Sequence, residues 1–380
     1  MKQYVASHLK DMNRQIVYNL ILERGTTSKA EISKLTGIST PTVLKIISYL
    51  IKSGLVLEIG EGESSIGRKP QLLTLNRDLM YTASFFLEGE FLTHGIVDIV
   101  GNVEYKRTLR CEPSFEEIVK LINTTLIEEM FADAGISQSK MMGIGIALPG
   151  VYDPEQQQLE TSPRLGITRP TYIGDALRAL SEKYGVRVWV ENDTNAQCFG
   201  EFRVSRMNKN EDLIFVSVGT GIGAGLILNG KLRRGPNYVC GEIGSILSWD
   251  DLVLINTEPN SLEGKVSYGI LEDKYGINVD TDFSKLPDQI VQLILDNVST
   301  PLVNCINNCI MFLDCNNVRI GGIVVDLLGD ELVAVINQKL SRMSLFNVQV
   351  QRQTNEDIGL IGIAAMLAER RALEILSTDN

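Results

Sequence analysis

Several features that would place a protein in a membrane or outside the cell are missing from this sequence. No stretch approaches the roughly 18 uninterrupted apolar residues that a membrane-spanning helix requires. Residues 1–15 are polar and contain no apolar signal-peptide core. The six cysteines include no Cys-x-x-Cys pair, which favours reduced thiols in a core over metal or redox chemistry. These absences predict a globular, cytoplasmic protein with no membrane partner.

Acidic residues outnumber basic ones, but the imbalance is confined to one part of the chain. The net charge is −11 at pH 7, which by itself argues against a nucleic-acid partner. Residues 1–70 nevertheless hold ten Lys or Arg against six Asp or Glu, a local net charge of +4. The remaining residues hold 26 against 41, a net charge of −15. A basic head on an acidic body suits a DNA-contacting module attached to a body that phosphates repel.

Two short helices joined by a glycine turn are predicted within the basic head. Ser28 lies three residues before Glu31, the spacing of a capping box, and the helix that it opens stops at Gly37. Ser39 is expected to cap the next helix, over residues 42–52. This helix-turn-helix pattern predicts DNA binding, with base or phosphate contacts from Ser39, Thr40, Thr42 and Lys45.

A two-stranded wing is predicted after these helices. Residues 55–59 alternate like a strand, a glycine-rich turn follows, and residues 71–75 form the returning strand. Arg68 and Lys69 precede Pro70, which favours an extended basic segment that fits a narrow minor groove. The alternative is a small three-helix protein-interaction domain with a solvated basic turn. Capping, turn, wing and charge together favour DNA binding.

From residue 80 onward, short apolar strands alternate with helices, the pattern of an α/β fold. The strands are predicted over residues 82–87, 93–99, 142–147, 186–190, 213–218, 223–228 and 317–320. The helices are predicted over residues 115–134, 173–184, 286–313 and 358–376.

Glycine-rich and carboxylate-bearing motifs lie at the ends of several predicted strands. The run 219–225 has glycine at alternate positions, which suits either a bound phosphate or a tight hairpin. Asn192 and Asp193 follow an apolar strand, where α/β sheets bind their ligands. Glu242 and Glu263 each lie beside a glycine. Carboxylates grouped around one pocket can accept paired hydrogen bonds from vicinal hydroxyls of a sugar, whereas a single one is more often a surface acid or turn cap.

Taken in order, these motifs resemble the ROK family of repressors, open reading frames and kinases. The resemblance covers essentially the whole chain and rests on Ala147-Leu148-Pro149-Gly150, Glu191-Asn192-Asp193, the 219–225 run, Gly241-Glu242-Ile243-Gly244, Leu262-Glu263 and Gly321-Gly322. It implies a two-lobed, actin-like (ribonuclease H-like) domain whose kinase members use the aspartate as the base for a sugar hydroxyl. The sugar-binding residues that it implies are Pro149, Gly150, Asn192, Asp193, Glu242, Ser245 and Glu263.

The chain departs from the kinase pattern at three places. The Asp-x-Gly-Gly-Thr phosphate loop becomes Phe86-Leu87-Glu88-Gly89-Glu90, which puts two carboxylates where phosphate charge must be neutralised. Kinase activity is therefore not expected. Ser245 and residues 246–259 replace the His and cysteine-rich loop that bind structural zinc, so no metal or cofactor is expected. Arg164 replaces an Asn and could pair with an anionic sugar phosphate or with a local carboxylate.

The sequence as a whole predicts three units and one function. The units are a winged helix-turn-helix (1–76), a first α/β lobe (77–190 plus 358–380) and a second α/β lobe (191–357). The predicted function is a sugar-responsive repressor of carbohydrate-utilisation genes that binds operator DNA as a homodimer or homotetramer. The alternatives are an active sugar kinase with an appended DNA-binding head, and a ligand-blind DNA-binding dimer.

Overall fold

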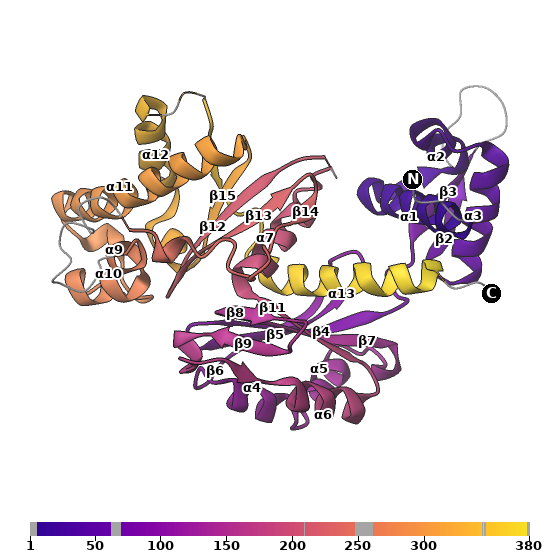
Figure 1. Ribbon diagram of the computed structural model, residues 1–380, viewed down its shortest axis with the longest axis horizontal. Helices are drawn as coiled ribbons and strands as arrows, with labels where there is room; N and C mark the ends of the chain where they lie inside the picture. Colours follow the sequence, from indigo (N-terminus) through magenta and orange to yellow (C-terminus); the bar gives the residue numbers. More distant parts are fainter. Residues whose placement is uncertain are drawn as a thin grey trace.

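The computed structural model describes residues 6–61, 70–208, 210–247, 261–343, 345 and 347–377. An N-terminal head is followed by two lobes, each built on a five-stranded sheet (Figure 1). The predicted fold class is confirmed: a winged helix-turn-helix precedes a two-lobed α/β domain. Arg68 and Lys69, the predicted wing contacts, lie outside the described residues. Within the part described, no helix is both long and apolar enough to cross a bilayer.

The head packs three helices on a small antiparallel sheet with the strand order β1-β3-β2. Ser28 begins the second helix as predicted, because its hydroxyl accepts a hydrogen bond from the Glu31 backbone N–H at 3.2 Å. Ser39 differs from the prediction: its hydroxyl bonds to the Thr42 hydroxyl, 2.8 Å away, and caps no backbone N–H. The elements are α1 (Ala6–Arg24), β1 (Thr26–Ser28), α2 (Lys29–Thr36), α3 (Thr40–Lys52), β2 (Val56–Glu61) and β3 (Gln71–Leu75).

The first lobe has the strand order β11-β7-β4-β5-β6. Its strands are β4 (Tyr81–Glu88), β5 (Phe91–Asp98), β6 (Val103–Arg110), β7 (Met141–Leu148) and β11 (Arg187–Asn192), and a small sheet of β8 (Val151–Asp153), β9 (Gln158–Thr161) and β10 (Thr171–Tyr172) lies beside them. One face is covered by α4 (Phe115–Ile122), α5 (Leu126–Asp133) and α6 (Gly174–Tyr184), and the other by α13 (Ile358–Ser377) (Figure 1). The single helix predicted over 115–134 is thus two helices, since the chain breaks at Asn123, and the Thr124 hydroxyl donates to the Leu121 carbonyl.

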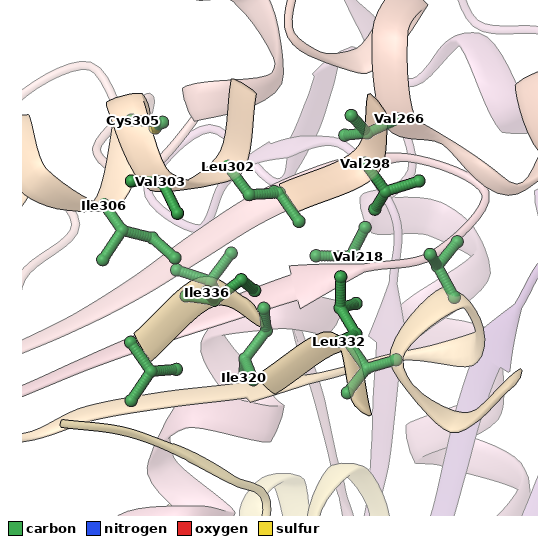
Figure 2. Close-up of a cluster of buried hydrophobic side chains, with 14 of the residues drawn as sticks. Val218, Val266, Val298, Leu302, Val303, Cys305, Ile306, Ile320, Leu332 and Ile336 are labelled. Carbon is green, nitrogen blue, oxygen red and sulfur yellow. The ribbon is translucent and has the colours of Figure 1, made fainter. Parts of the chain in front are cut away.

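The second lobe repeats this strand arrangement as β14-β13-β12-β15-β16. Its strands are β12 (Leu213–Val218), β13 (Ile222–Leu228), β14 (Lys231–Leu232), β15 (Val318–Gly321) and β16 (Val350–Arg352), and its helices are α9 (Glu263–Val266), α10 (Tyr268–Tyr275), α11 (Asp288–Leu313) and α12 (Ile323–Met343). Leu302 of α11 and Ile336 of α12 meet Val218 and Ile320 of the sheet in one buried cluster (Figure 2). The sequence reading missed β6, a half-exposed strand with polar alternate residues, and also α12 and β16.

Two helices cross between the lobes. The helix α7 (Asp193–Val204) begins at the end of β11 and packs on β12, β13 and α13. Gly362 of α13 lies so close to α7 that an added Cβ would be 1.7 Å from the Ala196 carbonyl oxygen. A Cβ on Gly200 of α7 would be 1.9 Å from the Ile358 carbonyl oxygen. The two backbones are therefore in direct contact, and only glycine fits at either position.

Candidate functional site

Asn192, the last residue of β11, joins two of the sequence motifs. Its Nδ2 donates a hydrogen bond to the Gly150 carbonyl oxygen, 3.0 Å away, and its Oδ1 accepts from the Asn195 backbone N–H, 2.9 Å away. The same side chain is thus the N-cap of α7 and the support for the turn after β7. That turn is held from its other side as well, because the Ser162 hydroxyl donates to the Pro149 carbonyl oxygen at 2.6 Å.

Asp193 occupies the first turn of α7, at the boundary between the lobes. Its Oδ1 accepts from the Thr194 backbone N–H at 2.8 Å. Burial raises the pKa of the Asp193 carboxyl to about 6, although its hydrogen bonds with Thr194 act in the opposite direction. A carboxylate with such a pKa near neutrality, at the start of a helix, can accept a hydrogen bond or a proton from a ligand hydroxyl.

The second lobe contributes Glu242 and Glu263. The Glu263 Oε2 accepts from the Ile222 backbone N–H at 3.1 Å and lies against the α-carbons of Gly221 and Gly244. Glu242 remains open to solvent. Partial desolvation, followed by the charges of Asp193 and Glu263, raises the pKa of Glu242 to about 7. Asp193 and Glu263 are therefore close enough to Glu242 to affect its pKa, and all three belong to the predicted set of sugar-binding residues.

Glu88, at the end of β4, belongs to the same group of carboxylates. An ideal Cβ on Gly219 would lie 3.1 Å from Glu88 Oε1, so the carboxylate of the first lobe lies against the β12–β13 turn of the second. Burial raises the pKa of Glu88 to about 7, with the charges of Asp193 and Asp326 adding to the effect and the Ile323 backbone N–H opposing it. We call Glu88, Asn192, Asp193, Glu242 and Glu263 the inter-lobe cluster.

The alternating glycines of 219–225 have two structural roles, one along β13 and one in the turn that precedes it. A Cβ on Gly223 would lie 2.6 Å from the Thr194 hydroxyl, and one on Gly225 would lie 2.2 Å from the Cys198 Cβ. These two glycines therefore allow α7 to pack on the strand. Gly219 closes the tight β12–β13 turn with a hydrogen bond from its N–H to the Gly221 carbonyl at 2.9 Å. The hairpin interpretation of the run accounts for Gly219, and the packing of α7 accounts for Gly223 and Gly225.

Sequence reasoning missed an ion pair beside the cluster. Glu191 is buried, and its Oε2 accepts from Arg234 Nε at 2.9 Å. Its Oε1 accepts from the Asn192 backbone N–H at 3.1 Å and from Asn195 Nδ2 at 3.2 Å. Arg234 follows β14, so the pair fastens the second lobe to the strand end that carries Asn192. A charged residue within the buried end of β11 is the sequence signal that could have indicated it.

The remaining predicted ligand residues, Ser245 and Arg164, are both exposed. Ser245 ends the short 3-10 turn Ile243–Ser245, which Glu242 directly precedes. Arg164 is exposed on the turn Pro163–Leu165, directly after Ser162, and it forms no ion pair with any described residue. Among the described residues, no group of three or more His, Cys, Asp or Glu is arranged to hold a metal ion.

The four DNA contacts predicted from the helix-turn-helix lie together in the first half of α3 and at its N-cap. Ser39, Thr40 and Lys45 are exposed there, and Thr42 is half-buried. Leu44, also exposed, lies on this helix and was not selected from the sequence. Apolar side chains in a recognition helix contact thymine methyl groups in the major groove, so Leu44 joins this candidate set.

Comparison with known proteins decides the family. Residues 89–370 match the model of the ROK family. The chain belongs to the ROK family. Residues 11–56 match a winged helix-turn-helix DNA-binding model, which places both predicted modules within one ROK protein.

Relatives with similar sequences include proteins named as repressors and as a transcriptional regulator. The chain is 31% identical to the xylose repressor of Bacillus subtilis over 62% of its own length and 60% of that protein. It thus spans about three fifths of that relative. A putative xylose repressor of Caldicellulosiruptor is 27% identical over 90% of this chain and 87% of its own. The regulator NagC of Escherichia coli is 26% identical over 63% of this chain and 58% of its own.

Two solved structures of ROK proteins have a similar fold. A ROK transcriptional regulator homologous to the Escherichia coli MLC protein covers 97% of this chain and 98% of its own, with a TM-score of 0.74 and 22% identity. A ROK glucokinase from Streptomyces griseus, in complex with glucose and AMPPNP, covers 75% of this chain and 98% of its own, with a TM-score of 0.59. The similarity to the regulator therefore includes the head, whereas the similarity to the kinase is to a shorter part of the chain.

Proposed function

We propose that this ROK protein is a sugar-responsive DNA-binding repressor whose lobes bind a sugar without phosphorylating it. The observation that carries the proposal is the presence, in one chain, of the inter-lobe cluster and of exposed side chains at α3 that could contact DNA, namely Ser39, Thr40, Leu44 and Lys45. Asp193, at the start of α7, and Glu242 and Glu263 of the second lobe bring carboxylate oxygens to one region beside Asn192, which suits a ligand with several hydroxyl groups. A chain that only dimerised and bound DNA would have no use for this set.

Glu88 is the reason for proposing binding without phosphoryl transfer. Its carboxylate lies against Gly219, at the position that resembles the phosphate loop of kinase members. A nucleotide phosphate placed there would meet Glu88 and Asp193 rather than groups that neutralise its charge. Incubation with ATP, magnesium and a sugar panel is therefore expected to give no sugar phosphorylation. Sustained phosphorylation would instead support the alternative of an active sugar kinase.

The ligand would act by shifting a two-state equilibrium. Binding between the lobes would bias their closure, and the heads of a homodimer would change their spacing on two half-sites of operator DNA. Release of DNA by the ligand is the direction proposed, in keeping with the repressor names of several relatives.

The test is a thermal-shift screen of the full chain against neutral sugars and sugar phosphates. The panel includes xylose and N-acetylglucosamine, the sugars in the names of relatives. A sugar that raises the Tm of the wild type, but not that of Asp193→Ala, supports the proposal. Asp175→Ala, an exposed acid in the first turn of α6, is the matched control and should keep the response. No response to any sugar would favour a ligand-blind DNA-binding dimer.

A further inference from the structure

The C-terminal helix α13 ends inside the head. Its residues Ala368, Ala372 and Leu376 are buried in the same apolar cluster as Val17 of α1 and Val43 of α3. In Figure 1 the yellow α13 runs from beside α7, across the first lobe, to the head. One helix therefore belongs to two hydrophobic cores, that of the head and that between the lobes.

Two side chains of the head bind the last carbonyl groups of α13. Arg14 of α1 donates from Nη1 to the Leu376 carbonyl oxygen at 2.7 Å, and Tyr49 of α3 donates from its hydroxyl to the Ile375 carbonyl oxygen. The last four carbonyl groups of a helix lack partners within it, and a cation is favourable at that end of the helix dipole. The head thus supplies the C-terminal cap of a helix that belongs to the ROK domain.

Arg14 and Tyr49 also contact each other directly. The Arg14 guanidinium carbon lies 3.5 Å from the centre of the Tyr49 ring, and only 5% of Arg14 is exposed. A buried cation placed over an aromatic ring and bonded to a carbonyl is fixed in orientation. Because Tyr49 lies on α3 and also bonds to Ile375, the pair fixes α3, with its exposed Thr40 and Lys45, relative to α13.

The other half of α13 is fixed to the inter-lobe cluster. Gly362 and Gly200 bring α13 and α7 into backbone contact, and α7 begins with Asp193. No side chain lies between the two backbones at that crossing to absorb a shift. By contrast, a cavity of about 290 Å³ separates α1 from the C-terminal half of α7, and it is lined by Leu22, Phe199 and Arg203 among others. A path of tight packing between site and head therefore runs through α13, beside the contact that Ile99, which follows β5, makes with the apolar cluster of the head.

We infer that Arg14 and Tyr49 are positioning residues that lock α3 to the end of α13, and that α13 carries the effect of the inter-lobe cluster to the DNA-binding helix. The second half of this inference rests on the proposed function, because it needs a ligand at the cluster. The first half does not, and the experiments keep the two apart.

The first experiment measures hydrogen–deuterium exchange in the full chain. Tyr49→Phe removes only the hydroxyl, and Arg14→Lys keeps the charge but loses the planar guanidinium. Each variant is expected to increase amide exchange in α3 and in the last turn of α13 about fivefold, the equivalent of one buried hydrogen bond. Tyr184→Phe is the matched control, since its hydroxyl donates to the Ile122 carbonyl at the end of α4, and it should affect only the first lobe. If amide exchange in α3 and α13 is unchanged in both Tyr49→Phe and Arg14→Lys, these residues do not hold α3 to the end of α13.

The second experiment measures coupling with the sugar found in the thermal-shift screen. In Tyr49→Phe the Kd for this sugar should stay within twofold of wild type. The sugar-induced change in operator affinity should shrink at least fivefold, a typical size for a coupling between sites. Suppose that Tyr49→Phe shows increased amide exchange but the sugar still changes its operator affinity as much as in the wild type. That result would overturn the role of α13. If no sugar changes the operator affinity of the wild type, the proposed function is refuted. The exchange data would still show whether Arg14 and Tyr49 hold α3 to the end of α13.

Discussion

The Glu88 carboxylate lies against the α-carbon of Gly219, so that a Cβ added to the glycine would be 3.1 Å from Oε1. The first residue ends β4 in one lobe, and the second follows β12 in the other. Burial raises the pKa of Glu88 to about 7 from an ordinary value of 4.5, so between these pH values the folded chain binds more protons at Glu88 than the unfolded chain does. Its contribution to stability is therefore most favourable below about pH 4.5 and declines until the pH passes about 7.

Glu88→Gln should remove this pH dependence. At pH 8 the variant is expected to melt on the order of 1–2 °C above wild type, and the difference in Tm between pH 5 and pH 8 should narrow. Differential scanning calorimetry at both pH values measures it. Glu90→Gln, which changes an exposed carboxylate bonded to Arg110 Nε at 2.7 Å, should leave the difference unchanged. Equal pH dependence in wild type and Glu88→Gln would disprove the assignment.

Arg164 tests whether the ligand is charged. The side chain is exposed beside the Ser162–Pro149 contact, and no described carboxylate pairs with it. If the effector is a sugar phosphate, Arg164→Ala should weaken its binding roughly tenfold, as expected for one charge-assisted hydrogen bond. Isothermal titration with glucose 6-phosphate and with neutral sugars separates the cases. Arg169→Ala, also exposed, is the control, and an unchanged affinity for every ligand in Arg164→Ala would end the idea.

The α7–α13 crossing predicts an intolerance of small additions. Gly362→Ala would place a methyl group 1.7 Å from the Ala196 carbonyl oxygen, so the helices must separate, at a cost of roughly 2 kcal/mol or more. Gly269→Ala is the matched control in α10, where no atom lies within 4 Å of the added carbon. That control should stabilise slightly, because alanine is the better helix former. Thermal unfolding of the pair measures both effects, and a neutral Gly362→Ala would contradict the close packing.

Lys45 tests the DNA-binding surface. It is exposed on α3 near Leu44, so Lys45→Ala should weaken operator binding and reduce the slope of log affinity against log salt by about 1. Fluorescence anisotropy over a series of salt concentrations gives the slope. Lys231→Ala removes an equally exposed lysine from β14 of the second lobe and should change neither quantity. A salt slope equal to that of wild type would remove Lys45 from the phosphate contacts.

The elements that the sequence predicts well depend on neighbours along the chain. Ser28 and Glu31 are three residues apart, and the cap that they form needs no tertiary contact. Buried strands such as β12 and β7 are continuous apolar runs that local hydropathy identifies. The half-exposed β6 has no such run, and the break at Asn123 depends on a local hydrogen bond that competes with the helix.

The order of domains, the α/β class and the residue types of the inter-lobe cluster were determined by the sequence, because capping, periodicity and strand ends are local properties. Only the tertiary structure decided that Arg14 binds the Leu376 carbonyl, 362 residues away, or that Arg234 of the second lobe neutralises Glu191. The same holds for Glu88 and Gly219. Such contacts arise when packing brings distant segments together. The hydrophobic periodicity of one segment does not identify the segment against which it packs.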